Sequence, residues 1–168
     1  ATNPADVKEA LENDDFDIVI NAIGILNLFA EENKSMAVML NGYLPHFIAD
    51  CLKDKKARLI HMSTDCVFAG VTTLTLAKAI ESAIKENLTG LYNLVNNESI
   101  NKFDLLSLFN KYFRNGKIVI NLNDKLKLDK SLRHKRTDFS FQVPSYEQQV
   151  KEMADWVNKH KELYPHYF

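Results

Sequence analysis

The sequence predicts an α/β fold built on a parallel sheet between helix layers. Residues 18–20 form a short run of consecutive apolar residues, and Leu59, Ile60 and Met62 mark a second one. Strands that are apolar on successive residues are typical of parallel sheets covered on both faces. The segment between the two runs has the length of a crossover helix, which parallel neighbours require. A strand–helix–strand unit is therefore expected in the N-terminal half.

Local signals place the elements around this unit. Asn3 and Pro4 predict a helix start, because asparagine caps a helix and proline suits its first position; this helix extends to about Asn13. A strand over 17–21 follows, and then a loop over 28–34.

A long helix is expected from the end of this loop to about residue 53, and the second strand over 57–63. Pro45 should bend the helix or leave a gap in its hydrogen bonds. The apolar spacing predicts an inward face, which comprises Met36, Met39 or Leu40, Tyr43, Phe47, and Cys51 or Leu52.

After Gly70 the pattern changes, and helices alternate with short apolar runs. The predicted elements are a helix over 71–86, a strand over 90–95, a helix capped by Ser99 or Asn101, a strand over 117–122 and a charged surface excursion over 123–142. Ser145 and Gln148 have the spacing of a capping box, which predicts the start of the last helix.

Small polar residues follow both N-terminal strands. The first strand leads into Asn21, Ala22, Ile23 and Gly24, and the second leads into Ser63, Thr64 and Asp65. In open α/β sheets, ligands bind outside the carboxyl ends of the strands. The sequence therefore predicts one pocket fed by both strand ends.

Composition excludes several classes of partner. The 168 residues carry 22 acidic and 21 basic side chains, so no long-range field indicates a nucleic acid or a membrane surface. Cys51 and Cys66 form no metal or redox motif, although they could pair in space, and a reduced, cytoplasmic setting is expected. His61 is interpreted as a core histidine, and no metal site is expected because the histidines lack ligand spacing.

The residues NAIG at 21–24, Asn41 and STDCVFAG at 63–70 resemble the extended short-chain dehydrogenase/reductase superfamily. They are most similar to its dTDP-4-dehydrorhamnose reductase branch, in which tyrosine usually stands where this chain has Cys66. The stretch LYNLVNNESINKFDLL and the helix VPSYEQQVKEM resemble the small C-terminal domain of the same branch.

The resemblance implies a partial Rossmann-like, doubly wound parallel sheet with a smaller α/β C-terminal domain. Residues 1–70 would belong to the NAD(P)-binding domain and residues 71–168 mainly to the substrate-binding domain. The cofactor would be NADP or NAD, and the substrate would be a nucleotide-linked sugar. The resemblance is also compatible with a homodimer.

Two parts of the family machinery are absent from the sequence. No two glycines are close enough for a pyrophosphate-binding loop, and no tyrosine is followed four residues later by lysine. We expect the 168 residues to be segments of a longer protein, with further segments before residue 1 and between 70 and 71. An intact mass near 19.3 kDa would contradict this expectation.

By the resemblance, Thr64 is the catalytic hydroxyl that hydrogen-bonds the substrate carbonyl oxygen, or else a residue that bonds the backbone at the strand end. Asp65 would hold a sugar hydroxyl or cap the following turn, with Cys66 and Val67 beside it at the substrate. The cofactor would lie against a further set of residues, whose alternative is an ordinary turn, helix or packing role: Asn21, Ala22, Ile23, Gly24, Asn41 and Ser63. By the resemblance, Asn41 bonds backbone near the active site; its alternative is a solvent-facing helix asparagine.

The resemblance implies NAD(P)H-dependent reduction of the C4 keto group of a nucleotide-linked 6-deoxy sugar, as in dTDP-L-rhamnose synthesis. Two alternatives remain open. One is an epimerase or dehydratase of the same superfamily, and the other is a non-catalytic nucleotide-binding regulatory subunit. The basic run over 125–136 either contacts a nucleotide diphosphate or is a solvated loop.

Overall fold

The computed structural model describes residues 2–63, 70–96, 98–122 and 132–165. The chain divides into two compact units, unit 1 (Ala1–Asp65) and unit 2 (Cys66–Phe168), and each is described by itself. No helix in these described ranges combines the length and apolar character needed to span a bilayer.

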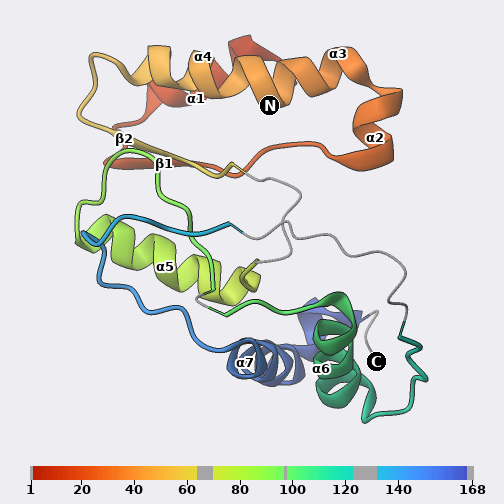
Figure 1. Ribbon diagram of the computed structural model, residues 1–168. Helices are drawn as coiled ribbons and strands as arrows, with labels where there is room; N and C mark the ends of the chain where they lie inside the picture. Colours follow the sequence, from red (N-terminus) through yellow and green to blue (C-terminus); the bar gives the residue numbers. More distant parts are fainter. Residues whose placement is uncertain (1, 64–69, 97, 123–131, 166–168) are drawn as a thin grey trace. The chain divides into compact units, whose positions relative to one another are not determined.

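Unit 1 is a two-stranded parallel sheet with helices packed on it (Figure 1). The strands pair in register from Ile18 opposite Arg58 to Asn21 opposite His61. The predicted strand–helix–strand unit is therefore confirmed. Its elements in chain order are α1 (Pro4–Asn13), β1 (Ile18–Asn21), α2 (Asn27–Glu32), α3 (Lys34–Ala37), the π-helix η1 (Val38–Tyr43), α4 (Leu44–Leu52) and β2 (Arg58–His61).

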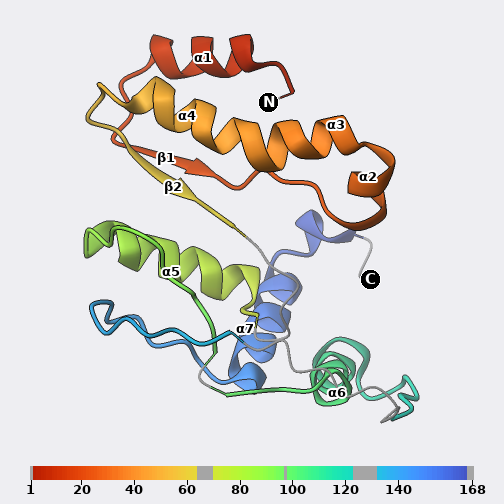
Figure 2. The same ribbon diagram turned by 45° about the horizontal axis from the view of Figure 1, so that its top comes forward.

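Within unit 1 the helices α1 and α4 cover one face of the sheet (Figure 2). Val19 and Leu59 pack from the strands against a core made by Leu11, Leu40, Leu44, Ile48 and Leu52. Ile20 lies on the opposite face and keeps 48% of its surface exposed. The sequence predicts that helices cover both faces of the sheet. Within unit 1, helices cover only one of them.

The long predicted helix is present as α3, η1 and α4 in direct succession, and its predicted inward face is confirmed in part. Leu40 and Leu52 are buried, and further predicted residues pack against the core: Met39, Phe47 and Cys51. Pro45 lies in the first turn of α4, where its missing N–H costs little, and the wider turns of the π-helix lie immediately before it. Met36 and Tyr43 are exposed, whereas the buried row runs through Leu40 and Leu44. The π-turns shift the phase of the helix, which a 3.6-residue spacing does not anticipate.

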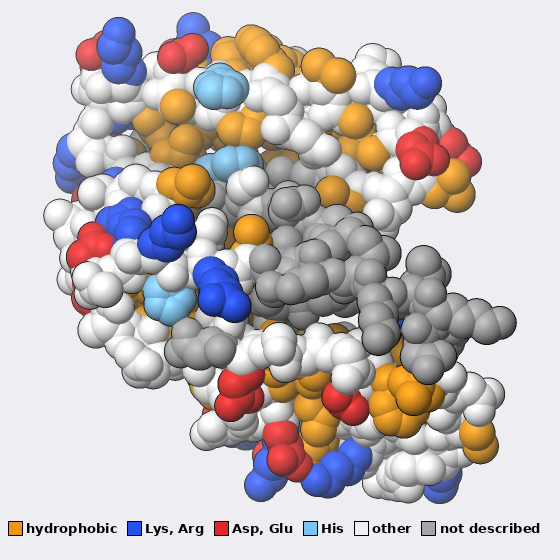
Figure 3. Space-filling view, in the orientation of Figure 1, with side chains coloured by type: hydrophobic (Ala, Val, Ile, Leu, Met, Phe, Trp, Pro, Cys, Tyr) orange, Lys and Arg blue, Asp and Glu red, His pale blue; other side chains and the backbone are white. Residues whose placement is uncertain are grey.

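The expected loop over 28–34 is also wrong, since most of it lies in α2. Apolar side chains of α2 and η1 reach solvent, among them Leu28, Phe29 and Val38. Figure 3 shows hydrophobic side chains exposed over this helical layer. Leu28, Phe29 and Val38 therefore do not enter the core of unit 1.

Unit 2 contains the helices α5 (Thr73–Lys85), α6 (Lys102–Arg114) and α7 (Tyr146–Lys159) and the short 3-10 helix η2 (Lys161–Leu163). All three long helices were predicted, and each begins at a side-chain cap. Thr72, Asn101 and Ser145 accept hydrogen bonds from backbone N–H groups of the first turn. The caps predicted at Asn101 and Ser145 are confirmed, and Thr72 is a further cap that was not predicted.

The smaller domain was expected to be α/β, but the described residues of unit 2 contain no strand. The segments 90–95 and 117–122, predicted as strands, have their backbone groups bound by side chains instead. Arg136 Nη1 donates to the carbonyl oxygen of Leu91 at 3.0 Å, and the Asn110 amide binds both the N–H and the C=O of Ile118. A strand needs a pairing partner, and the described residues supply none here.

The two long helices α5 and α7 are joined by a buried polar residue. Gln149 is 1% exposed; its Oε1 accepts from the backbone N–H of Thr72 at 3.1 Å, and its Nε2 donates to the carbonyl of Pro144 at 2.9 Å. Asn96 donates to the same carbonyl at 2.8 Å. This network fixes the start of α5 and the start of α7 against each other.

Candidate functional site at the strand ends

The carboxyl ends of β1 and β2 lie side by side. Asn21 pairs with His61, and the Met62 N–H donates to the Asn21 carbonyl at 2.9 Å, which extends the pairing one step beyond the strands. Ser63 follows at this edge and is exposed. The prediction that both strands end at one edge of the sheet is therefore confirmed.

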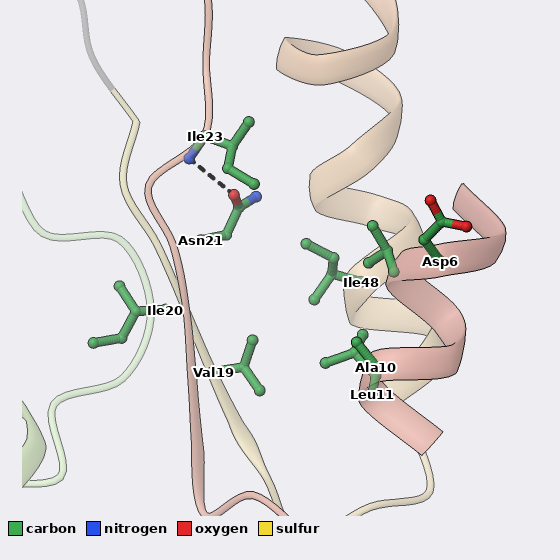
Figure 4. A pocket seen from close by; sticks show the side chains of 9 residues that line it. Asp6, Ala10, Leu11, Val19, Ile20, Asn21, Ile23 and Ile48 are labelled. Carbon is green, nitrogen blue, oxygen red and sulfur yellow. Dashed lines mark hydrogen bonds between the residues drawn. The ribbon is translucent and has the colours of Figure 1, made fainter. Parts of the chain in front are cut away.

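Asn21 turns the chain as it leaves β1. Its Oδ1 accepts from the Ile23 N–H at 3.1 Å, the local turn that asparagine favours. The side chain is 2% exposed, and its Nδ2 is buried without a partner among the described residues. In Figure 4 the amide lies on the side of the strand that faces α1 and α4. A buried amide donor without an acceptor costs free energy, which makes this atom a candidate contact point.

Asn41 holds the loop after β1 by a two-point contact, which we call the amide clamp (the Asn41 side chain and the Ile25 backbone). Its Oδ1 accepts from the Ile25 N–H at 2.9 Å, and its Nδ2 donates to the Ile25 carbonyl at 2.7 Å. The residue lies in η1, the π-helical segment before Pro45. Single π-helical turns occur frequently at functional sites.

The clamp depends on a residue without a side chain at position 24. A Cβ on Gly24 would lie 3.3 Å from Asn41 Oδ1, closer than such contacts normally are. Ala22, Ile23 and Gly24 are all exposed. The loop therefore presents two small residues, Ala22 and Gly24, and the apolar side chain of Ile23 at the strand end.

A cavity of about 290 Å³ opens beside this loop, between β1 and the helices (Figure 4). Its two polar lining side chains are Asp6 and Asn21, and the remaining lining residues are apolar: Val7, Ala10, Leu11, Val19, Ile20, Ile23 and Ile48. Val19 and Ile48 point toward each other across it (Figure 4). Such walls suit an apolar or planar group and contain no acid–base pair.

The predicted catalytic and substrate residues Thr64, Asp65, Cys66 and Val67 lie outside the described residues. The described ranges contain no group of three or more His, Cys, Asp or Glu side chains able to hold a metal ion. His61 is exposed, so its interpretation as a core histidine is wrong. The last residue of a short two-stranded sheet is not covered by the helices of unit 1.

Two features of the site were not deduced from the residues themselves. The resemblance implied that Asn41 bonds backbone, and its contact with Ile25 bears this out. Local propensity indicates neither this partner nor the unpartnered amide of Asn21. A signal exists in retrospect, because an asparagine within a helix is unfavourable unless its side chain has a specific partner. The proline four residues after Asn41 also marks the place where the helix departs from regular geometry.

Comparisons with known proteins bear on the N-terminal part. Residues 1–75 match a family model described as the RmlD substrate binding domain. This match contains all of unit 1 and the strand-end residues described above. No curated protein and no solved structure matches the chain.

Proposed function

We propose that this chain is part of a nucleotide-sugar reductase. The premise is that residues 1–75 belong to the RmlD substrate-binding family, whose members are dTDP-4-dehydrorhamnose reductase-like extended short-chain dehydrogenases/reductases. The reaction would reduce the C4 keto group of a nucleotide-linked 6-deoxy sugar. The family typically uses NAD(P)H and binds a nucleotide-sugar substrate. The cytoplasmic setting expected from the cysteines remains a prediction.

One observation supports this proposal beyond family membership. The two strand ends that carry the family-like residues are adjacent, in register and parallel, so Asn21 and Ser63 lie at the same edge of the sheet. A ligand bound outside this edge would meet both loops at once, as in other open α/β sheets. The amide clamp gives the first of these loops a fixed conformation before any ligand arrives.

The described residues fit one part of a dinucleotide cofactor. The turn of Ala22, Ile23 and Gly24 is exposed, so its backbone is open to a bound group. The five glycines of the sequence are spread too widely to form a pyrophosphate-binding loop. When bound, NAD(P)H would supply the hydride; the residues proposed to orient it are Asn21, Ala22, Ile23, Gly24, Asn41 and Ser63.

The chemistry assigned to this chain rests on Thr64. Its hydroxyl would donate a hydrogen bond to the carbonyl oxygen of the substrate, where negative charge develops during reduction. Asp65, Cys66 and Val67 would contact the sugar. With these assignments, residues 1–70 are proposed to belong to the cofactor-binding domain and residues 71–168 mainly to the substrate domain.

The test is NADPH consumption with dTDP-4-dehydrorhamnose, using the complete product of the encoding gene. We expect Thr64→Ala to lower kcat by roughly 10²–10³-fold, the usual cost of removing one such donor, and Thr64→Ser to retain most of it. Turnover that is absent with several keto sugars, or that is unaffected by Thr64→Ala, would contradict the proposal.

A second candidate is a non-catalytic nucleotide-binding subunit. It is favoured by the absence of any Tyr-x-x-x-Lys in the 168 residues, because the family reaction needs that pair as its proton donor. To separate the candidates, the encoding gene is read for a Tyr-x-x-x-Lys segment, and its complete product is tested for NADPH and dTDP binding by calorimetry and for turnover. Binding by a gene product that contains no such pair supports the subunit, whereas turnover by a product that contains the pair supports the reductase.

A further inference from the structure

A run of four basic residues borders a small cavity in unit 2, and the proposed function gives it no role. We propose that this cavity binds a phosphate-class oxyanion, held by Arg133 and Lys135. The cavity measures about 230 Å³, and it is lined by Leu91, Tyr92 and Asn93 on one segment and by Arg133, His134, Lys135 and Arg136 on the other. The chain as a whole carries a formal charge of −1, so this concentration of positive charge is local.

Hydrogen bonds tie the two segments of the cavity together. Arg136 Nη1 donates to the carbonyl oxygens of Thr89 and Leu91, at 2.6 and 3.0 Å. Asn93 Nδ2 donates to the carbonyl of Arg133 at 3.3 Å. The cavity is therefore formed by backbone held in place from both sides.

An aromatic cluster supports the same segments. The Tyr92 ring stacks on the His134 ring, with ring centroids 5.9 Å apart. The Phe139 ring packs edge-on against the Tyr92 ring, with centroids 5.1 Å apart. The Arg136 guanidinium lies 6.0 Å from the Tyr92 ring centroid. Burial, with the Asp138 charge as a second cause, raises the pKa of Tyr92, so this ring stays neutral beside the basic run.

The charges at the cavity are not all balanced. Arg136 is compensated, because Asp138 accepts from both its Nε, at 2.9 Å, and its Nη2, at 2.5 Å. The hydrogen bonds lower the pKa of Asp138 and raise that of Arg136, so the pair stays ionised. Arg133 and Lys135 are exposed, and neither forms an ion pair within the described part of the chain.

Arg133 and Lys135, two cations without an ion pair among the described residues, border one small cavity and suit an anion with several oxygen atoms. A guanidinium presents a planar fork of donors that matches phosphate oxygens, and an ammonium adds a second positive point. Figure 3 shows Lys and Arg side chains beside a histidine on the surface over α5. The matched family model ends at residue 75 and does not reach this cavity; a nucleotide as the bound anion would rest on the proposed function, whereas a free anion would not.

The experiment is a titration of the 168-residue chain at low ionic strength with inorganic phosphate, pyrophosphate and dTDP in separate arms. Binding is followed by calorimetry and by the NMR shifts of the Tyr92, Asn93 and His134 amides. The test variant combines Arg133→Ala with Lys135→Ala. The control combines Lys117→Ala with Lys159→Ala, which removes the same charge from exposed side chains elsewhere in unit 2.

We expect saturable binding of at least one arm, shifts confined to the cavity amides, and at least tenfold weaker binding in the test variant. If dTDP binds more tightly than pyrophosphate, the natural ligand is a nucleotide. If pyrophosphate binds more tightly than dTDP, the natural ligand is a free anion. The inference is overturned if no arm binds, if the control variant weakens binding as much as the test variant, or if the test variant binds normally. None of these results bears on reductase turnover, which is measured separately.

Discussion

Replacement of Asn41 tests whether the amide clamp fixes the loop after β1. Its two hydrogen bonds to Ile25 are 2.9 and 2.7 Å long, and each such bond contributes about 1 kcal/mol net. Asn41→Ala removes both, a loss of about 2 kcal/mol, and alanine recovers about 0.5 kcal/mol through its better helix propensity. We therefore expect unfolding to become easier by about 1.5 kcal/mol.

Asn41→Asp separates the two halves of the clamp. The carboxylate still accepts from the Ile25 N–H, but it can no longer donate to the Ile25 carbonyl and instead repels it. The stability loss should again be about 1–2 kcal/mol. The Ile25 amide, however, should stay protected from hydrogen exchange in Asn41→Asp and exchange roughly tenfold faster in Asn41→Ala.

The assay combines urea unfolding with amide exchange of the 168-residue chain, and Ser35→Ala, an exposed change in the same helical run, is the control. Equal exchange of the Ile25 amide in Asn41→Ala and in the unchanged chain would refute the clamp. So would equally fast exchange in the alanine and aspartate variants, because the remaining acceptor should distinguish them.

Three further changes test other parts of the structure. Gln149→Ala should destabilise unit 2 by about 1–3 kcal/mol in urea unfolding, because it leaves the half-buried Thr72 N–H unpaired and removes one of the two donors to the Pro144 carbonyl, which keeps its bond from Asn96; Gln148→Ala, exposed at the adjacent position, should cost less than about 0.5 kcal/mol. Gly24→Ala should loosen the clamp by pushing a methyl group to 3.3 Å from its amide oxygen, seen as faster exchange of the clamped amide without loss of the helices by circular dichroism. Because Arg136 lowers the pKa of Asp138, the stability from this pair is present above the ordinary pKa of an aspartate and is lost as pH falls through the lowered value; Asp138→Asn should flatten that part of an acid-unfolding curve, and an unchanged curve would contradict it.

The helices were predictable because their signals are local. Asn3, Asn101 and Ser145 cap the helices that the sequence indicated, and each cap involves residues at most three positions apart. The parallel pairing of β1 with β2 was also predictable, since two apolar runs joined by a helix-length segment allow few arrangements. The position of the proposed site, at the ends of the two strands, follows from this pairing alone.

The remaining errors concern partners that are distant in the sequence. Segments 90–95 and 117–122 have the composition of strands, yet a strand exists only where another lies beside it. Met36 and Tyr43 of the predicted inward face are exposed because the π-turns of η1 rotate everything before α4 relative to a regular helix. His61 and Ile20 lie on strands whose second face is not covered within unit 1. Their apolar sequence neighbours therefore did not imply that these side chains are buried.

Two asparagines on different helices use the same device, and it explains how the structure keeps single backbone segments in place. Asn41 binds both the N–H and the C=O of Ile25, and Asn110 binds both groups of Ile118. A side-chain amide has the same donor and acceptor as a peptide group, so it can satisfy one residue of a segment that has no neighbouring strand. At Ile118 the result is a held segment with exposed apolar side chains, and at Ile25 it is a held loop at the edge where two strands end. The second case alone places a fixed loop where a ligand of an open α/β sheet would bind, which is why Asn41, rather than any residue of the core, is the position at which folding and the proposed function meet.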